Sequence, residues 1–253
     1  MKKSPLIEDL VAASRILAHY GVLDGFGHVS ARSERKPAHF FMTRSVAPAL
    51  ATAADVIEHD ADSEPVGDKR KPFVERFIHG EIYRTRPEVM AIVHSHSPSV
   101  IPFGVSKTKL QPIYHMGSFL SAGAPVFEIR SHREQNDLLI RDRPLGEALA
   151  RTLGKCDCVL MRGHGMTVVG ESIQEAVFRA YYAEMNARLQ LQARLLEGPY
   201  EFLSDEEGRR YTATNRQVIE RPWELWKKSV AGASPGAGAR KRARGSAGSR
   251  RRR

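Results

Sequence analysis

The sequence predicts an α/β fold in which helices and strands are combined around one core. Short apolar runs, typical of buried strands, are interleaved with longer segments that have helical apolar spacing. The chain has 253 residues, which is long enough for one full domain with a sizeable core. We therefore predict a single domain over residues 1–230, with no internal repeat.

The amphipathic segments are predicted to be helices because their apolar residues recur every three or four positions. The first ends at Gly21, a residue typical of helix C-caps, and the second ends before Pro87. The last begins with a capping box formed by Ser172 and Glu175. The predicted helices span residues 6–20, 73–84, 138–153 and 172–196.

Short apolar runs between turn residues predict strands. These runs lie at 39–43, 89–94, 125–129, 158–161 and 166–169. Residues 58–71 are rich in Asp, Gly and charge, which predicts a surface excursion. The glycine-rich loop around Gly25 and Gly27 is not a dinucleotide fingerprint, because Ser30 replaces the third glycine. No nicotinamide cofactor is expected.

The net charge of +10 is concentrated at one end of the chain. Eight basic residues lie between Arg240 and Arg253, and removing their charges leaves +2 for the rest. Residues 231–253 contain almost nothing to bury, so we predict a disordered basic tail. The tail has no aromatic residue among its arginines, which favours an incidental or solubilising extension over nucleic-acid binding.

The cellular compartment is inferred from cysteines and apolar runs. The only cysteines, Cys156 and Cys158, are too close in sequence for a good disulfide between them, which fits a reducing compartment. No apolar run reaches the length that spans a bilayer, so no membrane contact is expected. We expect a cytoplasmic protein.

Three histidines in two short motifs indicate a metal site. His94 and His96 follow an apolar run, and residues two apart on a strand project to the same side. His164 follows a second apolar run and has a glycine on each side, which permits a sharp turn. An open catalytic site needs three such ligands, and imidazole binds zinc, manganese, iron and cobalt. The alternative is that the pair is only a polar strand end.

Glu75 is a candidate acid/base for this site. It lies on the predicted helix that leads into the histidine strand, and a carboxylate there can reach a metal ion or transfer protons. The alternative is an exposed helical glutamate. His79 follows four residues later on the same helix face and is either a pocket residue or a hydrogen-bonded interior histidine.

Four features follow one another along the sequence: the motif Gly27-His-Val-Ser-Ala-Arg32, Glu75, the histidine pair and the motif Arg162-Gly-His-Gly165. Their order resembles that found in the class II aldolase/adducin family. The resemblance covers residues 6–196. It implies that His94, His96 and His164 bind a divalent metal ion (zinc, manganese, iron or cobalt) and that Glu75 is the acid/base. It also implies a three-layer α/β/α fold with a largely antiparallel central sheet, where periodicity alone leaves a parallel doubly wound sheet open. A cyclic homotetramer with active sites between subunits is expected.

Departures from this family bear on the substrate. Sugar-phosphate aldolases of the family use Asn, a Thr-Pro-Ser-Gly turn and a Ser-Ser pair to hold phosphate, and the corresponding places here are His28, residues 43–46 and Phe73-Val74. A phosphosugar is therefore not expected. Arginines bind carboxylates bidentately, so a small carboxylated substrate is favoured, although each arginine can equally form a structural ion pair. The candidate substrate-binding residues are His28, Ser30, Arg44, Ser45, His79 and Arg162.

Residues 75–83, 94–104 and 112–116 resemble the decarboxylase branch of the family, whose members act on hydroxy-carboxymuconic semialdehydes and dihydroxyphthalates. Retro-aldol cleavage and decarboxylation both leave electrons on an enolate oxygen, a charge that a metal ion stabilises. Tyr114 and His115 are further candidates for returning the proton, from the position that the family presents to an adjacent subunit. The sequence thus predicts a metal-dependent decarboxylase. The alternatives are an aldolase for a non-phosphorylated hydroxy-oxo acid and a catalytically inactive adducin-like scaffold.

Overall fold

A seven-stranded sheet forms the centre of the protein in the computed structural model, which describes residues 4–231. The strand order is β3-β2-β1-β4-β7-β6-β5, and only the pair β5 and β6 is parallel. This arrangement confirms the predicted, largely antiparallel sheet and excludes a parallel doubly wound one. The strands are β1 (His28–Arg32), β2 (Phe40–Thr43), β3 (Val56–His59), β4 (Ala91–Ser95), β5 (Val126–Phe127), β6 (Cys158–Met161) and β7 (Gly165–Gly170).

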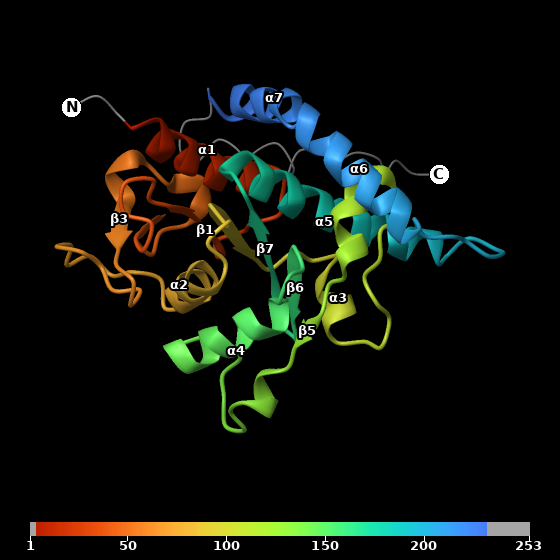
Figure 1. Ribbon diagram of the computed structural model, residues 1–253, viewed down its shortest axis with the longest axis horizontal. Helices are drawn as coiled ribbons and strands as arrows, with labels where there is room; N and C mark the ends of the chain where they lie inside the picture. The colour runs from red at the N-terminus through yellow and green to blue at the C-terminus, as the bar shows by residue number, and fades with distance from the viewer. Residues whose placement is uncertain (1–3, 232–253) are drawn as a thin grey trace, which may run out of the picture.

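Helices cover both faces of this sheet. In Figure 1, α1, α5 and α7 lie on one side of the strands, and α2 and α4 lie on the other. The α-helices are α1 (Pro5–His19), α2 (Arg76–Thr85), α3 (Ile101–Gly104), α4 (Arg143–Leu153), α5 (Ile173–Ala193), α6 (Asp205–Val218) and α7 (Glu220–Val230). Short 3-10 helices are η1 (Pro48–Leu50), η2 (Ala53–Asp55), η3 (His115–Ala122) and η4 (Ile129–Ser131). The predicted three-layer α/β/α fold is confirmed.

Alternating side chains of the strands build two separate cores. On β4, Val93 packs in the core with α1, α5 and α7, whereas Ile92 packs in the core with α2 and α4. The same alternation on β7 places Val168 in the first core and Val169 in the second. Because His94 follows Val93, its side chain points to the face covered by α2 and α4.

Two predicted helices begin later than the sequence indicates. The helix predicted over 73–84 is α2, which starts at Arg76, so Glu75 is its N-cap residue and is not inside the helix. The helix predicted over 138–153 is α4, which starts at Arg143 after the N-cap Asp142, whose side chain accepts a hydrogen bond from the Leu145 N–H. The apolar residues before Asp142 belong to a loop that packs on the core, which explains the misleading periodicity.

Several elements were not predicted from the sequence. Strand β1 has no continuous apolar run because polar residues occupy three of its five positions, yet every one of them is buried. Helix α6 is strongly polar and buries only Gly208 and Asn215, so it has little apolar periodicity. Helix α7 is anchored by Trp223 and Trp226 in the core with α1 and α5.

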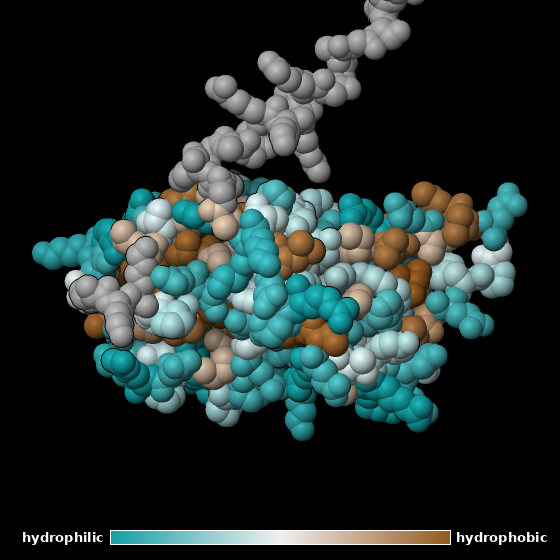
Figure 2. All heavy atoms as spheres, turned by 90° about the horizontal axis from the view of Figure 1, so that it is seen from above, coloured by the Kyte–Doolittle hydropathy of each residue, from teal (hydrophilic) through white to brown (hydrophobic). Residues whose placement is uncertain are grey.

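The outer surface of the protein is mainly hydrophilic when it is viewed from the side of α1 and α7, and apolar side chains are scattered over it (Figure 2). Within residues 4–231, no helix has the length and apolarity needed to span a membrane. From residue 232 on, the predicted basic tail lies outside the described residues.

Candidate metal centre

Glu75, His94, His96 and His164 converge at one end of the sheet. One ligand atom from each residue lies within 4.8 Å of the others. Glu75 Oε2 is 3.6 Å from His94 Nε2 and 3.5 Å from His164 Nε2, and the Nε2 atoms of His96 and His164 are 3.0 Å apart. The structure therefore brings together all four residues that the sequence singled out for metal binding and acid/base chemistry.

Strand pairing and close backbone contacts produce this convergence. His94 lies on β4 opposite Thr167 of β7, His96 follows β4 by one residue, and His164 immediately precedes β7. A Cβ atom at Gly165 would collide with the backbone oxygen of Ser95. Glycine at this position therefore allows the loop that carries His164 to approach β4.

Neighbouring groups set which nitrogen of His94 and of His164 has a lone pair available to a metal ion. His164 Nδ1 is 3.0 Å from the carbonyl oxygen of Leu138, which can only accept, so Nδ1 carries the hydrogen and Nε2 has the lone pair. His94 Nδ1 is 3.3 Å from Thr167 Oγ1, and that hydroxyl donates to the sulfur of Met161. His94 therefore donates through Nδ1 as well, and its Nε2 lone pair faces the cluster.

The cluster fits a divalent metal ion on its own chemistry. His94 Nε2 is buried and has no hydrogen-bond partner among the described residues, an arrangement that a metal ion would satisfy. Burial lowers the pKa of His94 well below its usual value and that of His164 to about 4, so both imidazoles are neutral at pH 7. Three neutral imidazoles and one carboxylate are a suitable donor set for zinc, manganese, iron or cobalt.

Glu75 is held in an environment that favours its protonated form. Its side chain does not cap α2, and Oε1 accepts a hydrogen bond from the Ile140 N–H at 2.9 Å. Burial raises the pKa of Glu75 to about 7, and the Ile140 hydrogen bond opposes this shift. A carboxyl group with this pKa can donate or accept a proton near neutral pH.

His28 lies beside the cluster, on the strand next to His94. The two residues are paired across β1 and β4, and their ring centroids are 5.0 Å apart. The centre of the Phe73 ring is 4.6 Å from that of His28. An imidazole and an apolar ring thus stand at the edge of the site, where the sequence departs from a phosphate-binding pattern.

The other candidate substrate-binding residues have different surroundings. Ser30 and His79 are fully buried and hydrogen-bond to each other at 2.6 Å, which matches the interior alternative for His79. Arg44 pairs with Asp55 at 2.8 Å, and Arg162 Nε lies 2.7 Å from a carboxylate oxygen of Glu128. Both arginines therefore form ion pairs within the chain, the alternative that the sequence left open. The Ser45 N–H donates to the Lys71 carbonyl.

Tyr114 and His115 make no contact with the cluster within the described part of this chain. Tyr114 packs near Tyr182 of α5, and its hydroxyl is buried without a partner among the described residues. The His115 ring packs near Tyr211 of α6, and its carbonyl accepts from Asn215 Nδ2 at 2.9 Å. Any role for them at a metal centre would therefore require another copy of the chain.

Three residues that orient the site were not predicted from the sequence. Leu138 and Ile140 act through backbone groups, which leave no side-chain signature. Thr167 acts through its hydroxyl, and its position in an otherwise apolar strand, next to Met166 and Val168, is the one signal that was available.

Comparisons with known proteins agree with this geometry. Residues 8–191 match the family described as the class II aldolase and adducin N-terminal domain. The decarboxylase tropJ of Talaromyces stipitatus is 36% identical over 248 residues, which cover 88% of this chain and 93% of that protein. A 3,4-dihydroxyphthalate decarboxylase of Terrabacter is 35% identical over 190 residues, covering 71% of this chain and 77% of that protein.

Solved structures show the same fold. L-fuculose 1-phosphate aldolase from Glaciozyma antarctica superposes with a TM-score of 0.74, covering 90% of this chain and 89% of that one at 22% identity. The sequence relatives confirm the predicted decarboxylase branch and the predicted enzyme class, a carbon–carbon lyase. On the family match and these relatives together, the chain belongs to the class II aldolase and adducin family.

Proposed function

We propose that the protein is a metal-dependent decarboxylase for a small carboxylated enol or 2-oxo acid from the breakdown of aromatic acids. A dihydroxyphthalate and 2-hydroxy-3-carboxymuconic semialdehyde are examples of such substrates. The observation that carries the proposal is the intact cluster of Glu75 and three histidines with His28 and Phe73 at its edge. The similarity to a 3,4-dihydroxyphthalate decarboxylase supports the substrate class.

In this proposal, His94, His96 and His164 hold the divalent ion, and their donor set suits zinc, manganese, iron and cobalt. When bound, the ion supplies positive charge that stabilises the negative charge left on a substrate oxygen as carbon dioxide departs. Glu75 faces the same space, and its carboxyl group is placed to return a proton to the substrate carbon. The Ile140 N–H keeps the carboxyl group in place during that transfer.

His28 is the substrate-binding residue that we favour. It is the candidate nearest to the cluster, whereas Arg44 and Arg162 are already paired with Asp55 and Glu128. The ring of Phe73 beside His28 offers an apolar surface to a planar substrate and no hydrogen bond to a phosphate. This combination supports an aromatic or enolic acid over a sugar phosphate.

We also propose a homotetramer in which a neighbouring copy completes each site. Tyr114 and His115 lie away from the cluster of their own chain and are candidates for proton delivery to another one. Phe26 is 68% exposed although its ring is near that of His96, and Leu195 is 84% exposed. Exposed apolar side chains of this kind are what a subunit interface would bury.

The decarboxylase proposal is tested by product analysis. Protein loaded with zinc or manganese is incubated with 3,4-dihydroxyphthalate, carboxymuconic semialdehydes and hydroxy-oxo acids, and products are measured by mass spectrometry. We expect loss of carbon dioxide from one of the first two classes, abolished by a chelator and by Glu75→Gln but retained in Glu224→Gln, which changes an exposed glutamate of α7. Release of pyruvate or an aldehyde without carbon dioxide would establish the aldolase alternative. Failure to bind any divalent ion would favour the inactive scaffold.

A further inference from the structure

A chain of buried hydrogen bonds runs from the interior of the protein to His28. The Tyr83 hydroxyl is 2.8 Å from Ser30 Oγ, which is 2.6 Å from His79 Nδ1. His79 Nε2 is in turn 2.7 Å from His28 Nδ1. All four residues are buried, with Ser30 and His79 fully inaccessible. The chain joins β1 to α2 and ends next to the metal centre.

The hydrogen bonds that link Tyr83 to His28 can all be donated in one direction or all in the other, and the two directions are not equivalent. Among the described residues, Ser30 Oγ is the only hydrogen-bond partner of the Tyr83 hydroxyl. If the Tyr83 hydroxyl donates to Ser30, then Ser30 donates to His79, and His79 Nε2–H donates to His28 Nδ1. If the direction is reversed, the Tyr83 hydrogen is left in the interior without an acceptor, which is a costly arrangement. In the first direction, the hydrogens of Tyr83, Ser30 and His79 that take part in the relay each have an acceptor.

The surroundings of Tyr83 and His79 support this direction. The guanidinium of Arg32 lies 4.6 Å from the centre of the Tyr83 ring and donates to the Tyr83 carbonyl, which fixes the tyrosine in place. Burial lowers the pKa of His79 well below its usual value, so its ring is neutral and carries one hydrogen. The ring can therefore donate through only one of its two nitrogens and must accept through the other. A neutral imidazole that donates through Nε2 must accept through Nδ1, which is the arrangement the first direction requires.

We propose that Tyr83, Ser30 and His79 are positioning residues that keep His28 in the tautomer with its hydrogen on Nε2. His28 then presents a fixed N–H donor at the edge of the metal centre, where it binds a carboxylate oxygen of the substrate. This inference rests on the proposed function and narrows it to substrates with a carboxylate beside the reacting group. A hydrogen-bond acceptor is selected there, and a substrate that offers only donors is rejected.

The donor nitrogen of His28 is not sealed in the protein interior. His28 Nε2 has no hydrogen-bond partner among the described residues, and it is not one of the fully enclosed unpaired atoms. The centre of the His28 ring is 4.6 Å from that of Phe73 and 5.0 Å from that of His94. A carboxylate bound there would stand next to the apolar ring of Phe73 and the metal ligands at once.

The tautomer is measured directly by two-bond ¹H–¹⁵N correlation spectra of protein with ¹⁵N-labelled histidine, in which His28 is assigned from the His28→Gln variant. We expect the Nε2–H form in the wild type, and a mixture of both forms in Tyr83→Phe and Ser30→Ala. Tyr20→Phe removes a tyrosine hydroxyl that contacts only Ser229 among the described residues, and it should leave the His28 signals unchanged. An Nδ1–H tautomer in the wild type would overturn the inference even if both relay variants fail to fold.

Binding of phthalate, a dicarboxylate without the reacting hydroxyls, tests recognition without catalysis. By calorimetry on the metal-loaded protein, His28→Phe should bind phthalate about 10-fold to 100-fold more weakly, the effect of losing one hydrogen bond to a charged group. His28→Gln, which retains an N–H donor, should recover part of the affinity, and Tyr83→Phe should show a smaller loss. Equal affinity in wild type and His28→Phe would overturn the inference. If the Nε2–H tautomer and phthalate binding are found but no carbon dioxide is released, the proposed function fails and the inference about His28 stands.

Discussion

His164 donates its Nδ1 hydrogen to the carbonyl oxygen of Leu138, and the two atoms are 3.0 Å apart. The backbone of Leu138 has a φ of 68°, which is unusual for a residue other than glycine. Two residues further on, the Ile140 N–H donates to Glu75. One short loop therefore orients both an imidazole and the carboxyl group of the candidate metal centre. Leucine rarely adopts the left-handed region, and such a conformation persists only where surrounding contacts, such as these two hydrogen bonds, hold the backbone in it.

The backbone of Leu138 should determine metal affinity. Leu138→Gly tolerates a positive φ and keeps the carbonyl, so we expect zinc affinity within about threefold of the wild type. Leu138→Val favours a negative φ because valine is β-branched, which would turn the carbonyl away from His164 and weaken binding by about tenfold or more. Competition with a chromogenic chelator measures both values. Equal affinities in the glycine and valine variants would show that the loop conformation does not control the site.

The hydroxyl of Thr167 should be equally important for His94. Thr167→Val has almost the same shape but cannot accept the hydrogen of His94 Nδ1, which would then move to Nε2 and block the metal. We expect metal affinity to fall by about 10-fold to 100-fold, as for other residues that orient a ligand. The control is Thr152→Val, because the Thr152 hydroxyl bonds only to Ala148 within α4 among the described residues. Similar affinities in the two variants would contradict the assignment.

The sequence was sufficient to predict which residues form the candidate metal centre because these four residues are chemically distinctive. Three histidines at strand ends and one glutamate could be recognised without coordinates, and the geometry places all four within 4.8 Å. The same patterns placed most strands within one or two residues of their observed limits. Strand β1 was not predicted because its polar residues serve the buried hydrogen bonds between Ser30, His79 and Tyr83.

The residues that orient the centre could not be predicted, for physical reasons. Leu138 and Ile140 contribute backbone groups whose direction depends on tertiary packing and not on residue type. The two arginines illustrate the opposite problem, since a guanidinium suits a substrate carboxylate and an internal carboxylate equally well. Only the folded structure shows that Arg44 and Arg162 face Asp55 and Glu128.

Acid should destabilise the protein partly through His59, which lies far from the metal ligands in sequence. The His59 side chain is inaccessible and stacks on Phe40 with ring centroids 5.0 Å apart. Burial lowers its pKa from 6.5 to about 4. The unfolded chain therefore binds this proton below pH 6.5, whereas the folded protein does so only near pH 4, so stability is lost as the pH falls between these values.

His59→Phe should remove this part of the pH dependence. From 1.36 kcal/mol per pKa unit, the wild type should lose about 3 kcal/mol through His59 between pH 6.5 and pH 4, and the variant should not. Urea unfolding at several pH values measures the difference. His132→Phe is the control, because His132 also stacks on a phenylalanine, Phe127, but is exposed. Parallel stability profiles for wild type and His59→Phe would contradict this account.

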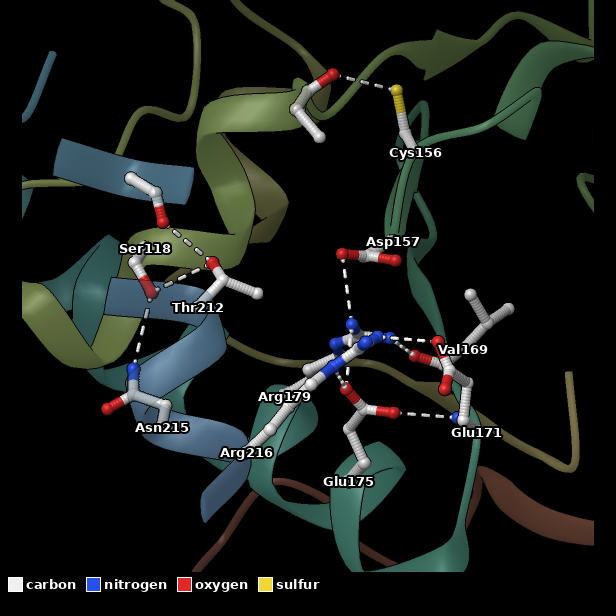
Figure 3. A network of polar contacts seen from close by, with 12 residues as sticks. Ser118, Cys156, Asp157, Val169, Glu171, Glu175, Arg179, Thr212, Asn215 and Arg216 are labelled. Atoms are coloured by element: carbon white, nitrogen blue, oxygen red, sulfur yellow. Dashed lines mark hydrogen bonds and ion pairs between the residues drawn. The ribbon is translucent and has the colours of Figure 1, made fainter. Parts of the chain in front are cut away.

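Arg179 should be the most important charged residue for stability. Its guanidinium lies between Asp157 and Glu175 (Figure 3), with ion-pair distances of 3.1 and 2.9 Å, and it also donates to the Val169 carbonyl. Arg216 of α6 reaches the same glutamate at 2.7 Å, which ties the C-terminal helices to the rest of the fold.

In Arg179→Met, Glu175 would keep Arg216, but Asp157, which is 18% exposed, would lose the only ion-pair partner it has among the described residues. Because a charge with little access to water is costly when it has no partner, we expect the free energy of unfolding to fall by about 3 kcal/mol. Arg216→Ala should cost about 1 kcal/mol, since Arg216 is 45% exposed and water compensates part of the loss. Arg210→Ala, at a site 78% exposed, should change stability by less than about 0.5 kcal/mol. Urea denaturation at pH 7 ranks the three variants, and an Arg179→Met loss no larger than that of Arg210→Ala would mean that the buried network does not stabilise the fold.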